Sequence, residues 1–201
     1  MKIATIILAA GSSSRMGKPK QLLPWGNTTL LGHSIQQAKN SSADEVLVVL
    51  GAQADLIKKK VDPFNPEVII NKDWQKGLGG SIGTGVSHLL SQEQQPDAIL
   101  IMLADQPLIT SAYLDEIITH YHKGSGDIIC TEYGSKSGVP AIFDKKYFSD
   151  LQNLEGDNGA GKLIAKHHKT SLSLNAGYKV KDLDTPEDYI SLKTIKTKYD
   201  S

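Results

Sequence analysis

The chain has 201 residues, and its 22 Lys and Arg are balanced by 22 Asp and Glu, so the formal net charge is zero. This balance excludes the strongly basic character with which proteins displace counterions from nucleic-acid phosphates, and we expect no nucleic-acid partner. With 39% hydrophobic and 22% charged residues, the composition is that of a folded globular protein. A single cysteine cannot form an internal disulfide, and no apolar run approaches the ~20 residues that span a bilayer. We therefore expect a cytoplasmic protein without membrane contact.

Apolar runs alternate along the chain with stretches of helical period, the pattern of an α/β fold with a mostly parallel sheet flanked by helices. The first run is expected to be a strand, not a leader segment, because it leads directly into a Gly/Ser loop. Strands are predicted over 3–10, 45–50, 68–71, 98–104, 127–131 and 139–143. Helices are predicted over 29–39, 81–90, 113–121, 158–168 and 185–198. No linker divides the chain, so we expect one domain over 1–201, with 133–158 the place for a small substrate-binding lobe.

The loop after the first strand runs Ala9-Ala10-Gly11-Ser12-Ser13-Ser14-Arg15. A loop at the carboxyl end of a central strand lies where open α/β sheets bind ligands. Its small side chains let backbone N–H groups approach anionic oxygens, and Arg15, Lys18 and Lys20 supply positive charge. The pattern favours a polyphosphate ligand. A flexible connection that carries ordinary surface cations is the alternative.

A second glycine-rich stretch, residues 156–162, matches the first seven positions of a P-loop. Leu163 stands where a P-loop has the Ser or Thr that binds magnesium, and the preceding residues are not an apolar strand, so a P-loop ATPase is disfavoured. Two interpretations fit this stretch equally: a loop that offers Lys162 to an anion, or a turn that caps the following helix.

Two aspartates are candidate metal ligands. Asp105 follows the uncharged run 98–104, and a carboxylate at the end of a buried strand is costly unless it is solvated or paired with a cation. Asp184 precedes Thr185 and Pro186, a pattern that also simply opens a helix. Together with a phosphate-binding loop, the two offer what Mg²⁺ takes in phosphoryl chemistry, which is one or two carboxylates plus substrate oxygens.

The chain has no G-x-S-x-G or H-E-x-x-H motif, and Cys130 lies inside a predicted strand, where a buried inert thiol is expected. A reaction whose nucleophile is itself an anionic phosphate needs no protein nucleophile. It needs charge neutralisation and positioning, for which this chain carries the residues.

Six blocks in this order resemble the MobA-like nucleotidyltransferases. They are Leu8-Ala9-Ala10-Gly11 continuing to Pro19-Lys20, Asn71 to Ile82, Asp105-Gln106-Pro107-Leu108, Gly138 to Phe143, Gly156 to Ala160, and Asp184-Thr185-Pro186-Glu187-Asp188. The resemblance implies a Rossmann-like fold of the glycosyltransferase-A type, also called the nucleotide-diphospho-sugar transferase type. It implies nucleotide contacts at Leu8, Ala9, Ala10, Gly11, Ser12, Ser13, Gly79 and Ser81, catalytic charge at Lys20 and Arg15, Mg²⁺ (or Mn²⁺) on the catalytic Asp105, and a second metal or substrate contact at Asp184.

The Ala-Ala-Gly form of the first block is similar to the cytidylyltransferase branch and favours CTP over GTP. That branch transfers CMP to the terminal phosphate of molybdopterin, releases pyrophosphate, and implies transient docking to a molybdoenzyme. Val139 and Gly161 depart from the family pattern, which usually has His and Arg there, in the half expected to bind the pterin. The alternatives are a guanylyltransferase, a cytidylyltransferase for another phosphate acceptor, and a non-catalytic module that delivers nucleotide or cofactor to a partner enzyme.

Overall fold

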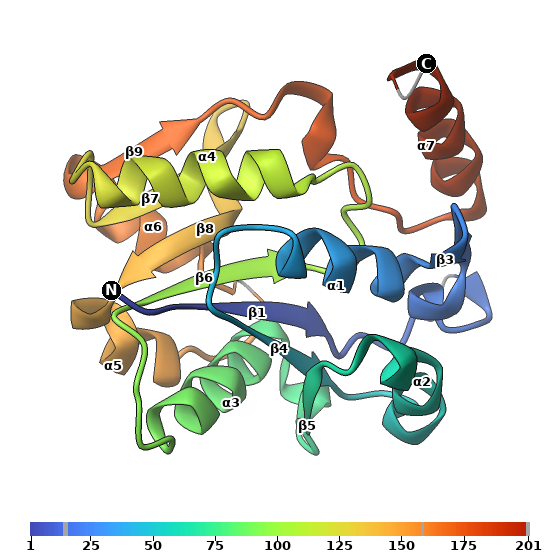
Figure 1. The fold of residues 1–201 in the computed structure, drawn as a ribbon, viewed down its shortest axis with the longest axis horizontal. Coiled ribbons are helices and arrows are strands. Elements are labelled where there is room, and N and C mark those ends of the chain that lie inside the picture. The colour runs from blue at the N-terminus through green and yellow to red at the C-terminus, as the bar shows by residue number, and fades with distance from the viewer. Residues whose placement is uncertain (14–15, 158, 200–201) are drawn as a thin grey trace.

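The computed structural model of the chain describes residues 1–13, 16–157 and 159–199. A seven-stranded sheet in the order β5-β4-β1-β6-β8-β7-β9 forms its centre (Figure 1). The strands are β1 (Ile3–Ala9), β4 (Glu45–Leu50), β5 (Glu67–Ile70), β6 (Ala98–Leu103), β7 (Ile128–Tyr133), β8 (Lys136–Asp144) and β9 (Ser171–Leu174), and a separate hairpin joins β2 (Pro24–Trp25) to β3 (Thr28–Thr29). The helices are α1 (Leu30–Lys39), α2 (Ala54–Val61), α3 (Leu78–Leu90), α4 (Ser111–His122), α5 (Phe148–Gln152), α6 (Gly161–Lys166) and α7 (Pro186–Tyr199).

The sheet is mostly parallel, which confirms the predicted fold class. β5, β4, β1 and β6 run parallel to one another, and β9 runs parallel to β7. β8 is the exception, since it is antiparallel to both of its neighbours, β6 and β7. The predicted substrate-lobe segment 133–158 thus contributes β8 to the central sheet and places α5 after it. Its role in binding substrate stays a prediction.

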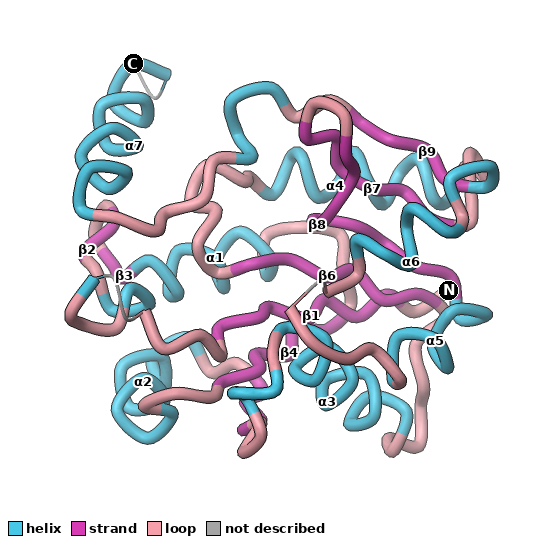
Figure 2. The backbone as a smooth tube through the Cα atoms, turned by 180° about the vertical axis from the view of Figure 1, so that it is seen from behind, coloured by secondary structure: helices cyan, strands magenta, loops and turns pink. Residues whose placement is uncertain are grey.

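Both faces of the sheet are covered by helices, and β1 shows how. Its side chains alternate, as they do along any strand. Ile3 and Ile7 join the apolar cluster under α1, α2 and α4, whereas Ile6 and Leu8 join the cluster under α3, α5 and α6. Burial on both faces explains why the strand is a nearly continuous apolar run. Figures 1 and 2 show the sheet between these two helical layers.

Apart from the short β2–β3 hairpin and the 3-10 turns, three elements have no counterpart in the sequence-based prediction. α2 buries Ala54, Ile57 and Val61, which have helical spacing, but it is only eight residues long and was not predicted. α5 is five residues long, and β9 four, both too short to give a clear period. The helix predicted over 158–168 begins only at Gly161. Residue 158 lies outside the described part of the chain, and Gly159 has a left-handed φ of 50°, which a helix does not accept.

The last helix, α7, stands beside the β2–β3 hairpin, away from the sheet (Figures 1 and 2). Its Leu192 joins Trp25 and Leu183 in a small apolar cluster, and the hydroxyl of Tyr189 donates to the carbonyl of Pro24 at 2.6 Å. These contacts hold α7 against the hairpin. The residues that lead into α7 are described with the candidate site below. Among the described residues, no helix has both the length and the apolar character needed to cross a membrane.

Candidate functional site

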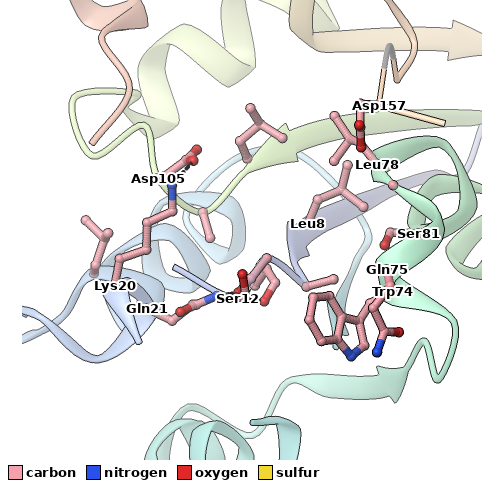
Figure 3. Close-up of a pocket in the computed structure, with 17 residues that line it drawn as sticks. Leu8, Ser12, Lys20, Gln21, Trp74, Gln75, Leu78, Ser81, Asp105 and Asp157 are labelled. Atoms are coloured by element: carbon pink, nitrogen blue, oxygen red, sulfur yellow. Dashed lines mark hydrogen bonds and ion pairs between the residues drawn. The ribbon is translucent and has the colours of Figure 1, made fainter. Parts of the chain in front are cut away.

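A cavity of about 380 Å³ opens at the carboxyl ends of β1 and β6 (Figure 3). It is lined by Leu8, Ala9, Ala10, Gly11, Ser12, Lys20, Gln21, Leu30, Trp74, Gln75, Gly77, Leu78, Ser81, Leu103, Ala104, Asp105 and Asp157. Charged Lys20 and Asp105 lie at one end, and Trp74, Gln75 and Ser81 at the other, as Figure 3 shows. The parallel strands bring these segments together because their carboxyl ends share one edge of the sheet. We refer to this cavity as the nucleotide pocket, after the nucleotide contacts that the sequence analysis predicts for several of its lining residues.

The loop that follows β1 is held from below by Gln21, which is 2% exposed. Its amide nitrogen donates to the carbonyls of Ala9 and Gly11, both at 3.0 Å, and its amide oxygen accepts from the hydroxyl of Ser13 at 3.2 Å. These bonds engage the loop carbonyls. No described group accepts from the N–H of Gly11 or Ser12, so these donors are left for a ligand. Sequence reasoning missed this role, because nothing in the sequence shows that a glutamine ten residues on turns back beneath the loop.

The ammonium of Lys20 lies between two carboxylates at the charged end of the nucleotide pocket. It donates to Oδ2 of Asp105 at 2.6 Å and to Oδ1 of Asp184 at 2.7 Å. Burial of the ammonium works to lower the pKa of Lys20, but the carboxylates of Asp105 and Asp184 outweigh it and raise the pKa above its ordinary 10.5. Lys20 is therefore a permanent cation at neutral pH, and it cannot serve as a base.

The same carboxylates fit a divalent cation. Oδ1 of Asp105 is buried and has no hydrogen-bond partner, and the Lys20 ammonium shows that Asp105 and Asp184 converge on one positive charge. Among the described residues, no three His, Cys, Asp or Glu side chains converge as a metal cluster. An ion held here would therefore complete its coordination with substrate oxygens, which is how Mg²⁺ is bound in phosphoryl-transfer sites.

Asp184 is positioned by the start of α7 and by the strand end at Asp105. The N–H of Leu183 donates to the carbonyl of Asp105 at 2.8 Å, which brings the two segments together. A capping box then fixes the next turn. Oδ2 of Asp188 accepts from the N–H groups of Thr185 and Asp184 at 2.8 and 3.2 Å, and the N–H of Asp188 donates to the hydroxyl of Thr185 at 3.2 Å. Asp184 can therefore stand at the opening of a helix and also contribute its carboxylate to the charged end of the pocket.

At the opposite end of the nucleotide pocket, Ser81 is 2% exposed and accepts a hydrogen bond from the amide of buried Asn71 at 3.0 Å. Gly79 is buried and does not line the pocket. A Cβ at position 79 would lie 2.8 Å from the backbone nitrogen of Glu155, so the glycine is needed for the close approach of α3 to that backbone. Gly77, with a φ of 100°, opens the helix in a conformation that L-residues rarely adopt.

The structure brings most of the predicted site residues to one place. The nucleotide pocket is lined by residues 8–12, Lys20, Ser81 and Asp105. Asp184 does not line it but accepts a hydrogen bond from the Lys20 ammonium, which does. Ser13 lies behind the loop, where its hydroxyl accepts from the N–H of Lys20 at 3.0 Å. Arg15 lies outside the described residues. Cys130 is buried as predicted, and burial raises the pKa of its thiol, which disfavours the reactive thiolate.

A polar cluster borders the nucleotide pocket beyond Asp105. The side-chain nitrogen of Gln106 donates to the hydroxyl of Tyr133 at 2.6 Å and to Oδ1 of Asp182 at 2.9 Å, and the Tyr133 hydroxyl donates to the carbonyl of Val139. Burial, and then the charges of Asp105 and Asp184, raise the pKa of Asp182. These residues line a further cavity of about 300 Å³ that shares Leu78 and Leu103 with the nucleotide pocket.

The fold and the site define a nucleotide-binding α/β protein whose charged groups suit phosphate chemistry, and comparison with known proteins agrees. A family model described as MobA-like NTP transferase domain matches residues 5–170. The molybdenum cofactor cytidylyltransferase of Escherichia coli (strain K12) is 28% identical over 192 residues, 95% of each chain. The purine catabolism protein PucB of Bacillus subtilis (strain 168) is 27% identical over 194 residues, 92% of each chain.

A crystal structure of Rv0371c from Mycobacterium tuberculosis H37Rv in complex with manganese superposes with a TM-score of 0.79 at 28% identity, covering 96% of this chain and 98% of that one. The bifunctional protein GlmU of Alkaliphilus metalliredigens (strain QYMF) is 32% identical over 146 residues, which are 71% of this chain and 31% of GlmU. The chain thus spans about a third of that relative. The chain belongs to the MobA-like NTP transferase family.

Proposed function

We propose that this protein transfers CMP from CTP to the terminal phosphate of molybdopterin and releases pyrophosphate. The observation that carries the proposal is the convergence of Asp105 and Asp184 on one cation at the charged end of the nucleotide pocket. The nucleotide assignment is supported by the Ala9-Ala10-Gly11 form of the loop. The acceptor assignment is supported by the likeness to the molybdenum cofactor cytidylyltransferase of E. coli, which extends over 95% of both chains.

In this reaction an oxygen of the acceptor phosphate forms a bond to the α-phosphorus of CTP. The bond between the α-phosphorus and the oxygen that bridges to the β-phosphorus breaks, and pyrophosphate leaves with that electron pair. The attacking oxygen is already ionised at neutral pH, so no side chain has to remove a proton. This agrees with a pocket whose lining includes no histidine or cysteine.

The residues of the chain supply charge and orientation. An ammonium has three N–H donors, and two of those on Lys20 are used by Asp105 and Asp184, so the third is left for a phosphate oxygen. The N–H groups of Gly11 and Ser12 are two further donors, and Ser81 with Trp74 lies at the end of the pocket that would receive the nucleoside. A divalent ion on Asp105 and Asp184 would neutralise phosphate charge. Asp105 and Asp184 would hold that ion, and Lys20 and the loop would hold the phosphates.

The test is release of pyrophosphate, measured with each of the four nucleoside triphosphates in Mg²⁺, with and without molybdopterin. We expect release that requires both CTP and molybdopterin, together with a product that contains CMP. Release with GTP in place of CTP would assign a guanylyltransferase. Tight nucleotide binding without any release would assign a non-catalytic delivery module and overturn the proposal.

A further inference from the structure

A second large cavity lies outside the nucleotide pocket, on the half of the molecule built by β8, β9 and α6. Its volume is about 560 Å³. It is lined by Ser135, Lys136, Ser137, Gly161, Lys162, Ile164, Ala165, His168, Ser171 and Ser173. We call it the distal cavity. None of the residues that line it also lines the nucleotide pocket.

The lining of the distal cavity combines cations with hydroxyl groups. Lys136 and Lys162 are exposed, and no ion pair within the described residues uses either ammonium, while the ring of His168 adds a further nitrogen. No carboxylate is among the lining residues. A cavity with two unpaired ammonium groups and no acidic side chain selects an anion, because any anion that enters meets attraction alone.

The hydroxyl groups form an ordered wall beside these cations. The hydroxyls of Ser137 and Ser173 are hydrogen-bonded to each other at 2.8 Å, and that of Ser173 lies 3.3 Å from the buried thiol of Cys130. The hydroxyl of Ser171 donates to the carbonyl of His167 at 2.8 Å. The bond between Ser137 and Ser173 uses the O–H of one of the two, so the O–H of the other can be donated to a bound oxyanion by a hydroxyl that is already ordered.

The 300 Å³ cavity beside Gln106 and Val139 is a neighbour of both the distal cavity and the nucleotide pocket. That intermediate cavity shares Lys136, Ser137 and Gly161 with the distal cavity, and it shares Leu78 and Leu103 with the nucleotide pocket. The three cavities thus lie in a row from Asp105 to Lys136 and Lys162, and we call this row the groove.

The missing side chain of Gly161 keeps this groove open. A Cβ at that position would meet only the carbonyl oxygen of Ser137, at 3.9 Å, so a larger side chain would extend into the groove and not into the core.

We propose that the distal cavity binds a second anionic group on the phosphate acceptor, so that the acceptor is an elongated molecule with an anion at each end. The reacting phosphate lies at the Asp105 end of the groove, and the second anion lies between Lys136 and Lys162 at the other. This inference rests on the proposed transfer to a phosphate acceptor, and it adds the substrate class that this half of the site selects.

The first experiment does not depend on turnover. Inorganic phosphate is titrated into the ¹⁵N-labelled protein, and backbone amide shifts are followed at Ser137, Lys162 and Ser173. We expect saturable shifts at these amides, separate from those at Gly11 and Ser12. The double variant Lys136→Gln/Lys162→Gln should bind phosphate in the distal cavity about tenfold more weakly. Lys166→Gln is the matched control, because it removes an exposed charge of the same helix that does not line the cavity.

The second experiment measures transfer to molybdopterin. The double variant should raise KM for the acceptor about tenfold, with kcat and the KM for CTP unchanged. Gly161→Trp should raise the acceptor KM in the same way by obstructing the groove. A merely structural role for the lysines would lower the unfolding temperature instead, which thermal unfolding of each variant measures.

The outcomes separate this inference from the proposed function. If no transfer to molybdopterin occurs with any nucleotide, the proposed function fails, and the phosphate titration still decides whether the distal cavity binds an anion. Two results would overturn the inference: distal amide shifts that persist unchanged in the double variant, or an acceptor KM that stays at the parental value in it.

Discussion

Replacement of Lys20 by Gln tests the charged end of the nucleotide pocket most directly. The glutamine keeps much of the length of the side chain but removes the cation between Asp105 and Asp184. The change leaves two carboxylates facing each other, and the buried Oδ1 of Asp105 still has no partner. Both the stability and the turnover of the protein should fall.

The loss of stability follows from how far the three groups are exposed. The side chains of Lys20 and Asp105 are 15% and 20% exposed, and that of Asp184 is 45% exposed. Removing one partner from a fully buried ion pair costs about 3–5 kcal/mol, whereas exposed pairs contribute about 0.2–1 kcal/mol. This partly screened pair lies between those limits, so we expect a loss of ~1–2 kcal/mol. For a chain of this size that lowers the unfolding temperature by about 2–8 °C.

The sign of the pH dependence follows from the raised pKa of Lys20. Because the folded-state pKa lies above the ordinary 10.5, the ammonium's contribution to stability is fully present at neutral pH. It is lost only as the pH rises above that value. The difference in unfolding temperature between the parent and Lys20→Gln should therefore be the same at pH 7 and pH 9.

The catalytic effect is measured as pyrophosphate release at saturating CTP and Mg²⁺. Removal of one positioned group that stabilises charge in the transition state costs about 10²–10³ in kcat. Without nucleotide, Mg²⁺ should raise the unfolding temperature of Lys20→Gln more than that of the parent, because no ammonium competes for the carboxylates. Lys59→Gln, an exposed lysine on α2, is the control. A Lys20→Gln protein with parental kcat and parental unfolding temperature would refute the assignment of this end of the pocket.

Three further changes test other parts of the site. Asp105→Asn should lower kcat about 10²–10³-fold while the protein stays folded, and a rate within threefold of the parent would remove Asp105 from the catalytic groups. Gly79→Ala should destabilise the protein by ~1–3 kcal/mol in chemical unfolding, because the new Cβ would lie 2.8 Å from the backbone nitrogen of Glu155. A variant as stable as the parent would mean that α3 shifts without cost. Asp188→Ala removes half of the capping box of α7 and should cost ~0.5–1 kcal/mol at pH 7. The Thr185 hydroxyl, more than its backbone N–H, holds the pKa of Asp188 below the ordinary 3.8. The difference in stability between the parent and Asp188→Ala should therefore shrink as the pH falls below 3.8. A difference in thermal unfolding that does not change with pH would contradict the capping role of Asp188.

The fold class, and the gathering of the candidate residues at the carboxyl ends of β1 and β6, could be predicted because both depend on local signals. A continuous apolar run followed by small residues and charge marks β1 and its loop, and the uncharged run before Asp105 marks β6. The partnership of Lys20 with two carboxylates could not be predicted. Its members are separated by 85 and 164 residues along the chain, and no local pattern encodes so distant a contact.

The support from Gln21 and the distal cavity were missed for related reasons. Gln21 acts through main-chain carbonyls, whose positions depend on the path of the loop and not on residue type. The distal cavity depends on β9, a four-residue strand with the sequence Ser-Leu-Ser-Leu that is too short to stand out. It also depends on the placement of β8 between β6 and β7, which no periodicity reveals.

The capping box at the start of α7 has a consequence for the order in which the molecule is completed. Every strand of the central sheet ends at or before Leu174, ten residues ahead of Asp184 in the chain. The sheet can therefore form before Asp184 is in place. At that stage Lys20 has Asp105 as a carboxylate partner but does not yet have Asp184. The arrival of the final helix then sets Asp184 in place, so competence for chemistry should lag behind folding, and a chain halted just after β9 should be compact yet inactive.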